Sequence, residues 1–391
     1  MKLIVVGCGQ CGGRIADEFA RLHLRARAQR GLQIITGAFA VNTDVADLSG
    51  LTSIKPNYNF RILIGGRKTG GHGVGKINEL GAELAREDAD KVLETIRNTK
   101  NFAEADAFLL IGAAAGGTGS GSLPVLTQQI KERYVDKPIY NMIVLPFEHE
   151  ETTEERTVYN VATCLKSAYL VSDAIFLVDN QRYARKDASI LSNLSKINSL
   201  ITRPFYGLLC AGEEKKPKYI GAKMLDAGDI IQTLAGWTTI GYGHSQNQFL
   251  GSLFKKSRDF RNKATETQKG VQSMDEAISG LSLKCNPIDS KRGLYLVSAP
   301  SKDINMDLIK ELGTYMKSLA PEAVLRSGDY PRDRGGLDVT VILSELSDVE
   351  KIRNYFSKAI NLIAAIKKRQ TGLVSQQRDI DITIKDIPSL L

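Results

Sequence analysis

The chain has 391 residues, of which 42% are hydrophobic and 25% charged, and its formal net charge is +8 at pH 7. This length predicts one large domain or two to three smaller ones, and the composition is typical of a globular protein. No segment has the length and apolarity that a membrane span needs, and the N-terminal apolar run is too short for a secretory signal. We therefore expect a cytoplasmic protein without a transmembrane segment.

The basic residues are dispersed, so we expect no nucleic-acid partner. Their densest segment, 253–270, is interpreted as a solvated loop, with a nucleic-acid or lipid patch as the alternative. The cysteines are odd in number and scattered, which argues against a disulfide framework. Cys8 and Cys11 form a C-x-x-C pair, but no second pair follows and the four histidines do not cluster. We expect no metal held by protein ligands alone.

Apolar runs and helical patterns alternate over the first 180 residues, which predicts a Rossmann-like, mostly parallel sheet with helices on both faces. Such sheets bind ligands in loops at the carboxyl ends of their strands. The expected strands are Leu3–Val6, Phe39–Val41, Arg61–Ile64, Phe108–Ile111, Ile139–Leu145 and Ala174–Val178.

A long helix is expected over Ile190–Leu209 because its apolar residues recur on one face, and Pro204 is expected to kink or end it early. A second α/β region follows Ile220. Its expected elements are helices near Asp229–Trp237, Met306–Leu319 and Asp348–Ala365, and strands near Thr238–Tyr242, Gly293–Ser298 and Leu337–Leu343. The alternating isoleucines of 379–387 suggest an edge strand.

The first glycine loop, Gly7–Gly13, follows a strand, opens a helix and fits G-x-G-x-x-G. Glycine allows a sharp turn and a close approach to a phosphate, which the N-terminus of the next helix then binds. The default interpretation of this pattern is a dinucleotide-binding domain with an acidic residue about 20 positions later. Asp44 is the candidate, but it lies further along the chain.

The second glycine loop, Ile111–Gly121, follows another apolar strand, and we expect Ser122 and Pro124 to begin the next helix. The loop has no Gly-Lys-Ser/Thr ending and so is not a Walker A motif. Backbone N–H groups and the hydroxyls of Thr118 and Ser120 would have to hold the phosphates. A second anion-binding loop in one domain favours a nucleoside triphosphate over a dinucleotide.

A third glycine cluster, Gly65–Gly75, also follows a strand, and either Lys68 or Arg67 is a candidate to reach a terminal phosphate. The alternative is a flexible surface loop. Three glycine clusters after strands of one sheet predict a common site at its carboxyl edge.

These motifs resemble those of a known family. The hexapeptide Gly116–Gly121 matches the signature of the tubulin/FtsZ superfamily, Gly9–Gly12 resembles the first phosphate loop of tubulin, and Asn42–Asp44 resembles the second loop of FtsZ. Gly71–Gly75, followed by Asn78–Glu83, resembles the archaeal CetZ group, as does Arg326–Pro331. The resemblance extends to about Ala365.

The resemblance implies a GTP-binding domain over 1–188, a central helix over 189–212, a smaller α+β activation domain over 213–385, and a tail over 386–391. It also implies that GTP or GDP binds with Mg²⁺ held through the phosphates. The phosphate-binding residues implied are Gly9, Gln10, Cys11, Gly12, Gly13, Asn42, Asp44, Gly71, Gly116, Gly117, Thr118, Gly119, Ser120 and Gly121.

The base and ribose contacts are also carried over from the resemblance. Asn180 and Asn198 match the two residues that recognise guanine, and both amides donate and accept hydrogen bonds. Leu194 stands where the family usually has an aromatic side chain stacked on the base. For the glutamate that binds the ribose, the family's spacing counted forward from Pro146 gives Glu150. The same spacing counted back from Asn180 leads to the neighbourhood of Glu154.

Asp226 and Asp229 lie three residues apart at a predicted helix start, which places both on one face. Stabilisation of the helix dipole explains them structurally. The resemblance to FtsZ instead implies a catalytic acidic loop that acts on the nucleotide of the next subunit. Met224 departs from the Asx residue that the family has at its position.

The sequence therefore predicts a GTP-hydrolysing cytoskeletal protein that assembles head-to-tail into a homopolymer and acts in cell shape. The alternatives are an FtsZ-like division GTPase, an NAD(P)-binding oxidoreductase that uses Gly7–Gly12, and a nucleotide-binding protein that neither polymerises nor hydrolyses. A membrane tether or an accessory protein is a further candidate partner.

Overall fold

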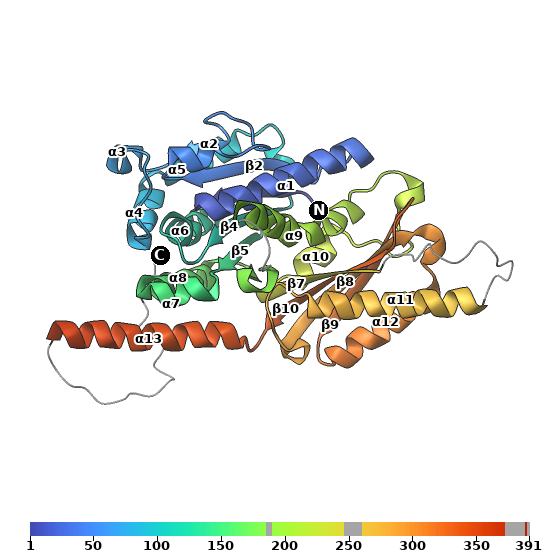
Figure 1. The fold of residues 1–391 in the computed structure, drawn as a ribbon. Coiled ribbons are helices and arrows are strands. Elements are labelled where there is room, and N and C mark those ends of the chain that lie inside the picture. The colour runs from blue at the N-terminus through green and yellow to red at the C-terminus, as the bar shows by residue number, and fades with distance from the viewer. Residues whose placement is uncertain (185–189, 246–259, 372–387, 389–391) are drawn as a thin grey trace. The chain divides into compact units, whose positions relative to one another are not determined.

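The computed structural model describes residues 1–184, 190–245, 260–371 and 388, and the chain forms two compact units (Figure 1). The parallel-sheet unit comprises Lys2–Leu24, Ile35–Leu200 and the C-terminal helix α13 (Glu350–Thr371). The mixed-sheet unit comprises Arg25–Ile34 and Ile201–Ser347, together with the first residue.

The parallel-sheet unit is built on six strands in the order β3-β2-β1-β4-β5-β6, all parallel. Residues of β1, β5 and β6 are buried along their whole length, as in sheets covered on both faces. The order of the strands reverses between β1 and β4, which creates a crevice at their carboxyl ends. The strands are β1 (Leu3–Cys8), β2 (Ile35–Asn42), β3 (Arg61–Leu63), β4 (Ala107–Ala113), β5 (Ile139–Leu145) and β6 (Ala174–Asp179).

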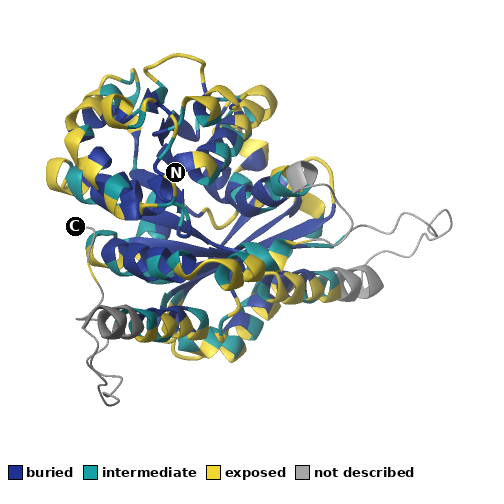
Figure 2. Ribbon diagram, turned by 60° about the vertical axis from the view of Figure 1, so that its left-hand side comes forward, coloured by how far each residue is buried: buried dark blue, intermediate teal, exposed yellow. Residues whose placement is uncertain are grey.

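Helices follow most of these strands, and buried residues gather on the strands and the inner helix faces in Figure 2. Helix α6 packs on α4 and α8 and contacts β1, β4 and β5. The helices are α1 (Gly9–Arg30), α2 (Val45–Ser49), α3 (Gly66–Thr69), α4 (Asn78–Glu87), α5 (Ala89–Arg97), α6 (Thr118–Arg133), α7 (Glu148–Thr153), α8 (Glu155–Val171) and α9 (Ile190–Ala211). The predicted mostly parallel α/β fold is confirmed.

The mixed-sheet unit has four strands in the order β7-β10-β8-β9, of which only the β8–β9 pair is parallel. Helix α11 packs on β7 and β10 and contacts α12. The elements are β7 (Gly236–Ser245), β8 (Ser290–Pro300), β9 (Val324–Arg332), β10 (Leu337–Leu346), α10 (Ala227–Thr233), α11 (Phe260–Ser279) and α12 (Met306–Leu319).

Two prolines lie inside helices, where the prediction placed Pro124 at a helix start and Pro204 at a kink or an early end. Helix α9 continues past Pro204 to Ala211, and α6 begins at Thr118 rather than at Ser122, so that Pro124 lies inside it. Each proline removes one backbone hydrogen bond, but the packing of the largely buried flanking residues offsets that loss.

Other boundaries of the second half also differ from the prediction. Helix α10 ends at Thr233, and Trp237 belongs to strand β7. Strand β9 was not predicted. It contains Pro331 and, within the described residues, pairs with β8 alone, and such edge strands tolerate proline. The segment interpreted as a basic loop is helical from Phe260 onward, and its part before residue 260 lies outside the described residues, as does the tail strand expected over 379–387.

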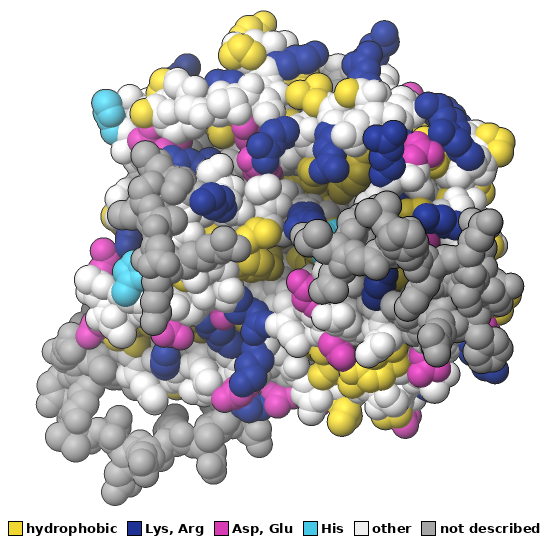
Figure 3. Space-filling view, turned by 45° about the vertical axis from the view of Figure 1, so that its right-hand side comes forward, with side chains coloured by type: hydrophobic (Ala, Val, Ile, Leu, Met, Phe, Trp, Pro, Cys, Tyr) yellow, Lys and Arg dark blue, Asp and Glu magenta, His cyan; other side chains and the backbone are white. Residues whose placement is uncertain are grey.

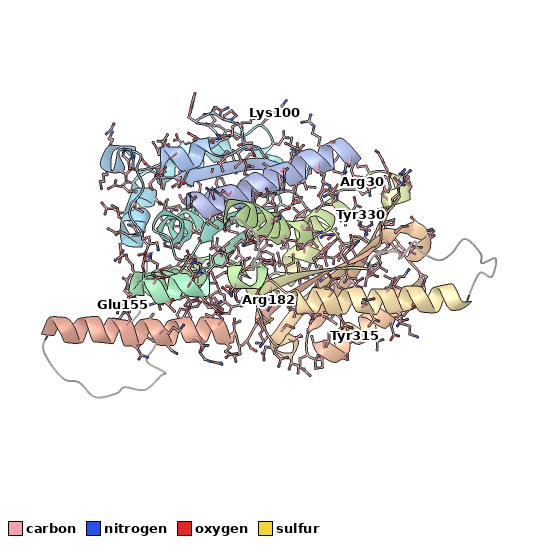
Figure 4. The ribbon with its side chains drawn as sticks, viewed as in Figure 1. Arg30, Lys100, Glu155, Arg182, Tyr315 and Tyr330 are labelled. Atoms are coloured by element: carbon pink, nitrogen blue, oxygen red, sulfur yellow. The ribbon has the colours of Figure 1, made fainter. Side chains whose placement is uncertain are left out.

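A buried charge cluster stabilises the mixed-sheet unit. The guanidinium of Arg30, labelled in Figure 4, lies over the ring of Tyr219 at 3.5 Å and near that of Tyr330 at 5.3 Å. It pairs with Glu214 at 3.7 Å, and the Tyr330 hydroxyl donates to the same carboxylate at 3.3 Å. The buried carboxylate is therefore neutralised and hydrogen-bonded, as buried charges require.

Lysine and arginine side chains are spread over the face shown in Figure 3, with acidic side chains among them. Among the described helices, none combines the length and hydropathy needed to cross a bilayer.

Candidate functional site

A cavity of about 680 Å³ lies in the parallel-sheet unit, at the carboxyl ends of its strands and beside α9. Its size is in the range of sites for nucleotides and other small molecules. Of the residues predicted for the site, those that line the cavity are Gly9, Gln10, Cys11, Asn42, Asp44, Gly116, Gly117, Thr118, Gly119, Glu150, Asn180, Leu194 and Asn198.

Two helix N-termini face this cavity. Helix α1 begins at Gly9, directly after β1, and α6 begins at Thr118, after the glycine turn that follows β4. The two turns touch, since a Cβ on Gly9 would lie 2.8 Å from the backbone nitrogen of Gly119. The first N–H groups of a helix have no partner within it and carry the positive end of its dipole. The cavity therefore has the chemistry of an anion-binding site with two donors of this kind.

The turn after β2 joins the same site. The Thr43 hydroxyl shares a 2.6 Å hydrogen bond with the hydroxyl of Thr118, and both side chains are buried. The Asn42 side chain accepts from the Thr43 N–H at 2.8 Å and donates to Asp47 at 3.1 Å. The carboxylate of Asp47 also accepts from the Gln10 amide at 2.6 Å, which links this turn to the N-terminus of α1.

Some predicted glycines serve packing rather than the cavity. A Cβ on Gly12 would lie 2.1 Å from the Ile111 carbonyl oxygen, and one on Gly121 would lie 2.1 Å from that of Asn78. These glycines let α1 approach β4 and let α6 approach α4. Gly13 also lies outside the cavity lining, within van der Waals distance of side chains in the unit's core.

Three further predicted residues are also absent from the lining. Gly71 has a left-handed backbone, with φ of 81°, and its carbonyl accepts from the Val45 N–H at 3.0 Å. The Ser120 hydroxyl is buried and bonds back to the carbonyl of Gly116. Glu154 pairs with Lys76 at 2.7 Å, so of the two candidate ribose glutamates only Glu150 lines the cavity.

The residues predicted to contact the base and the ribose come from the short helix after β6, from α7 and from α9. Asn180 follows β6 directly, in the short helix Asn180–Tyr183 that also holds Arg182, labelled in Figure 4. The preceding Asp179 accepts from the Gln181 N–H at 3.1 Å and from the Lys351 ammonium at 2.8 Å. Lys351 belongs to α13, so the C-terminal helix anchors this rim of the cavity.

A second anchor joins α13 to the helix that bears Glu150. Glu151 accepts from the Tyr355 hydroxyl and pairs with Lys358 at 3.1 Å. Glu150 itself accepts from the Phe147 N–H at 2.8 Å, which holds its carboxylate at the start of α7. Burial is the largest cause of a raised pKa of Tyr355, and the nearby carboxylates raise it further, so its hydroxyl stays a donor at neutral pH.

Sequence reasoning missed several lining residues, including Arg14, Asp47, Lys76, Gln181 and Asn193. Among the described residues, the buried Oδ1 atom of Asn193 has no hydrogen-bond partner, so it offers an acceptor to a ligand. Nothing local in the sequence distinguishes Arg14 or Lys76 from the chain's other cations.

The lysine predicted to reach a phosphate is not in the cavity. Lys68 pairs with Glu83 at 2.6 Å and with Glu87 at 2.5 Å, and neither it nor Arg67 belongs to the lining. Two acidic side chains of α4 hold its ammonium on the surface. Within the described part of the chain, the lysine or arginine side chains that line the cavity are Arg14 and Lys76.

Both cysteines of the C-x-x-C pair line the cavity. Burial raises the pKa values of Cys8 and Cys11 to about 12, so both thiols are protonated at neutral pH. Over residues 1–184, 190–245 and 260–371, no group of three or more histidine, cysteine, aspartate or glutamate side chains is placed to hold a metal ion.

The predicted catalytic carboxylates lie in the mixed-sheet unit. Asp226 caps α10 by accepting from the Asp229 N–H at 2.9 Å, and Asp229 accepts from the Asp226 N–H at 3.4 Å. This reciprocal cap accounts for both residues structurally. Asp226 nevertheless remains exposed, as does the apolar Met224 two residues earlier.

Strand β9 holds this acidic turn in place. The Arg326 guanidinium lies 3.4 Å from the Asp229 carboxylate. The buried Asp329 accepts from the N–H groups of Ala222 and Lys223 at 3.0 and 2.7 Å. The Arg326–Pro331 motif thus fixes the approach to the turn and orients one of its carboxylates.

Comparison with known families agrees with this arrangement. Residues 2–186 match the GTPase domain of the tubulin/FtsZ family, and residues 187–361 match the C-terminal domain of tubulin-like CetZ proteins. The chain belongs to the CetZ group of the tubulin/FtsZ superfamily. This confirms the resemblance drawn from the glycine motifs, and the oxidoreductase interpretation of Gly7–Gly12 loses its support.

Individual CetZ proteins match over nearly their whole length. CetZ5 of Haloferax volcanii is 31% identical over 97% of this chain and 96% of its own, and CetZ1 of the same organism is 31% identical over 92% of each. The solved structure of CetZ1 as a GDP-bound monomer has a TM-score of 0.79, with 29% identity over 93% of this chain and all of the other. The GTPγS-bound protofilament of Haloferax volcanii CetZ2 has a TM-score of 0.80, with 26% identity over 94% of this chain and all of the other.

Proposed function

We propose that this protein binds GTP in the cavity of the parallel-sheet unit, hydrolyses it, and assembles head-to-tail into protofilaments. The observation that carries the proposal is the convergence of the α1 and α6 N-termini on one cavity at the β1–β4 switch point. The CetZ proteins solved with GDP and with GTPγS support the choice of nucleotide, and the CetZ2 protofilament supports assembly.

In this proposal the phosphates rest on the backbone N–H groups of Gly9–Cys11 and Gly116–Gly119. Guanine faces Asn180 and Asn198, and the unpartnered Oδ1 of Asn193 provides a further acceptor for its N–H groups. Glu150 accepts from the ribose hydroxyls. Leu194 contributes apolar contact where the family usually has an aromatic ring, so stacking is weaker here.

Magnesium is expected with the triphosphate, because Mg²⁺ usually binds through substrate phosphates and one or two carboxylates. Asp44 and Asp47 both line the cavity and fit that requirement. When bound, the ion neutralises phosphate charge and favours the transition state. Asp44 also caps α2, and Asp47 accepts from Gln10 and Asn42, so both carboxylates are already oriented.

Hydrolysis in this proposal needs a second subunit. Asp226 and Asp229 of the next subunit orient and polarise the water that attacks the terminal phosphate, and the donors of the two helix N-termini stabilise the charge that develops. The exposed Asp226 and Met224 suit a turn that meets another molecule. Assembly then completes the active site, and hydrolysis weakens the contact.

The test is a double variant that keeps the helix cap. Asp226→Asn with Asp229→Asn retains capping, because asparagine caps as well as aspartate, but removes both charges. We expect phosphate release to fall at least 100-fold while the GTP affinity stays within about twofold. Asp307→Asn, in the first turn of α12, is the matched control and should hydrolyse GTP normally.

Mixing separates catalysis between subunits from catalysis within one. Open space surrounds the Cβ position of Gly116, so the fold can accommodate a leucine there, and its side chain blocks the cavity. The acidic turn of the Gly116→Leu variant is unchanged. Neither this variant nor the double asparagine variant should hydrolyse GTP alone, and a mixture should recover activity. Wild-type hydrolysis by the double variant, or no recovery in the mixture, contradicts the proposed mechanism.

Membership in the CetZ group favours a role in cell shape over a role in division. Host cells that lack the protein should lose their normal shape and still divide on schedule. Filamentous or multinucleate cells of normal width would instead indicate a division role.

A further inference from the structure

Lys76 has an unusual backbone at the edge of the cavity. Its φ is 62°, and across the described residues it shares a positive φ with only one other non-glycine residue, Glu345. This conformation costs roughly 1–2 kcal/mol for a residue with a Cβ, and such strain persists where the surroundings enforce it. Here the Lys76 carbonyl accepts from the Arg156 guanidinium at 3.0 Å and from the Asn160 amide at 2.9 Å.

The same contacts tie Lys76 to the glycine turn before α6. The amide of Asn160, which is buried, also donates to the carbonyls of Ala115 at 3.0 Å and Gly116 at 3.2 Å. A Cβ on Gly117 would lie only 2.9 Å from the carbonyl carbon of Lys76. The backbone of Lys76 therefore abuts the turn that offers its N–H groups to the cavity.

The Lys76 ammonium is held by an interaction that is easily exchanged. It lies 2.7 Å from the Glu154 carboxylate, and the two side chains are 41% and 47% exposed. Exposed pairs of this kind contribute only about 0–1 kcal/mol. Glu154 precedes α8, whose first residue, Glu155, is labelled in Figure 4. A triphosphate in the cavity carries more charge than one carboxylate and competes for the same cation.

We propose that Lys76 leaves Glu154 when GTP binds and that its ammonium contacts the terminal phosphate, so that this lysine distinguishes GTP from GDP. The inference rests on the proposed GTP site and adds to it a specificity-determining residue. The strained backbone fixes Lys76 at the edge of the cavity, and the Glu154 carboxylate holds the ammonium at the rim when no terminal phosphate is present.

The experiment measures the dissociation constants of GTPγS and GDP separately for the wild type and for three variants of Lys76. Lys76→Asn removes the charge with a residue that tolerates the left-handed backbone, Lys76→Gly removes the charge and the strain together, and Lys76→Arg keeps the charge. Lys68→Ala, on the same glycine-rich segment but outside the cavity, is the matched control.

We expect Lys76→Asn and Lys76→Gly to weaken GTPγS binding about tenfold and GDP binding less than twofold. The arginine variant and Lys68→Ala should keep the wild-type ratio. Glu154→Gln, which frees the ammonium, should tighten GTPγS binding several-fold without affecting GDP.

An unchanged GTPγS-to-GDP ratio in Lys76→Asn, with a wild type that binds both nucleotides, overturns this inference and leaves the proposed function standing. A wild type that binds neither nucleotide overturns the proposed function, and the inference falls with it.

Discussion

The two glycine-rich segments beside the cavity use glycine for different physical reasons. In 65–75 all the glycines except Gly66 are needed for the backbone, because Gly65, Gly70, Gly71, Gly73 and Gly75 have positive φ. In 112–121 none has a positive φ, but most leave no room for a Cβ. One segment needs left-handed turns, and the other needs close packing of a helix on its neighbours.

The segments meet at Gly117, where an added Cβ would lie 2.6 Å from a methyl carbon of Val74 and 2.9 Å from the nitrogen of Ile77. Glycine therefore satisfies a different physical constraint in each of the two segments. Substitution by alanine separates these constraints, since alanine adds a Cβ without a polar group or a long side chain.

The largest effect is expected at Gly121. A Cβ there would lie 2.1 Å from the Asn78 carbonyl oxygen and 2.6 Å from the Ala82 nitrogen, both in the backbone of α4. Because backbone atoms cannot move aside cheaply, Gly121→Ala should destabilise the fold by roughly 3–5 kcal/mol or prevent folding. The midpoint of thermal unfolding measures this. Gly50→Ala, with only ordinary contacts, is the control, and equal midpoints for the two variants would refute the packing explanation.

An intermediate effect is expected at Gly75. Its φ is 56° and no atom lies within 4 Å of its Cβ position, so only the backbone conformation opposes a side chain. Gly75→Ala should lower stability by about 1–2 kcal/mol, and Gly75→Asn should cost less, because asparagine tolerates the left-handed region better. Denaturant titration of both variants tests the order. If alanine and asparagine cost the same, the left-handed backbone is not the reason for glycine there.

The smallest effect on stability, and the sharpest on function, is expected at Gly116. Its φ is ordinary, nothing lies within 4 Å of its Cβ position, and it lines the cavity. Gly116→Ala should change stability by less than about 0.5 kcal/mol, since neither backbone nor packing requires glycine. It should weaken GTPγS binding at least tenfold, because the methyl group occupies space that the phosphate needs. Calorimetric titration checks the affinity, and normal binding would mean that no phosphate approaches Gly116.

Much of the parallel-sheet unit was predictable because its signals are local. Strands such as β1 and β4 are nearly continuous apolar runs, and a glycine turn follows each of them directly. The ends of elements were less predictable where tertiary packing outweighs a local signal, as at Pro124 inside α6 and Pro204 inside α9. Strand β9 was not predicted because it contains a glycine and a proline, which are unfavourable inside most strands; among the described residues it pairs with β8 alone.

The sequence by itself determined the fold class, the family and the glycine turns of the candidate site, because apolar periodicity and a rare hexapeptide depend on near neighbours in the chain. Only the tertiary structure decided that Lys76 rather than Lys68, and Glu150 rather than Glu154, lines the cavity. The ammonium groups of the two lysines are held by partners distant in the sequence, Glu154 for Lys76 and the acidic side chains of α4 for Lys68. Spacing along the chain does not encode those contacts.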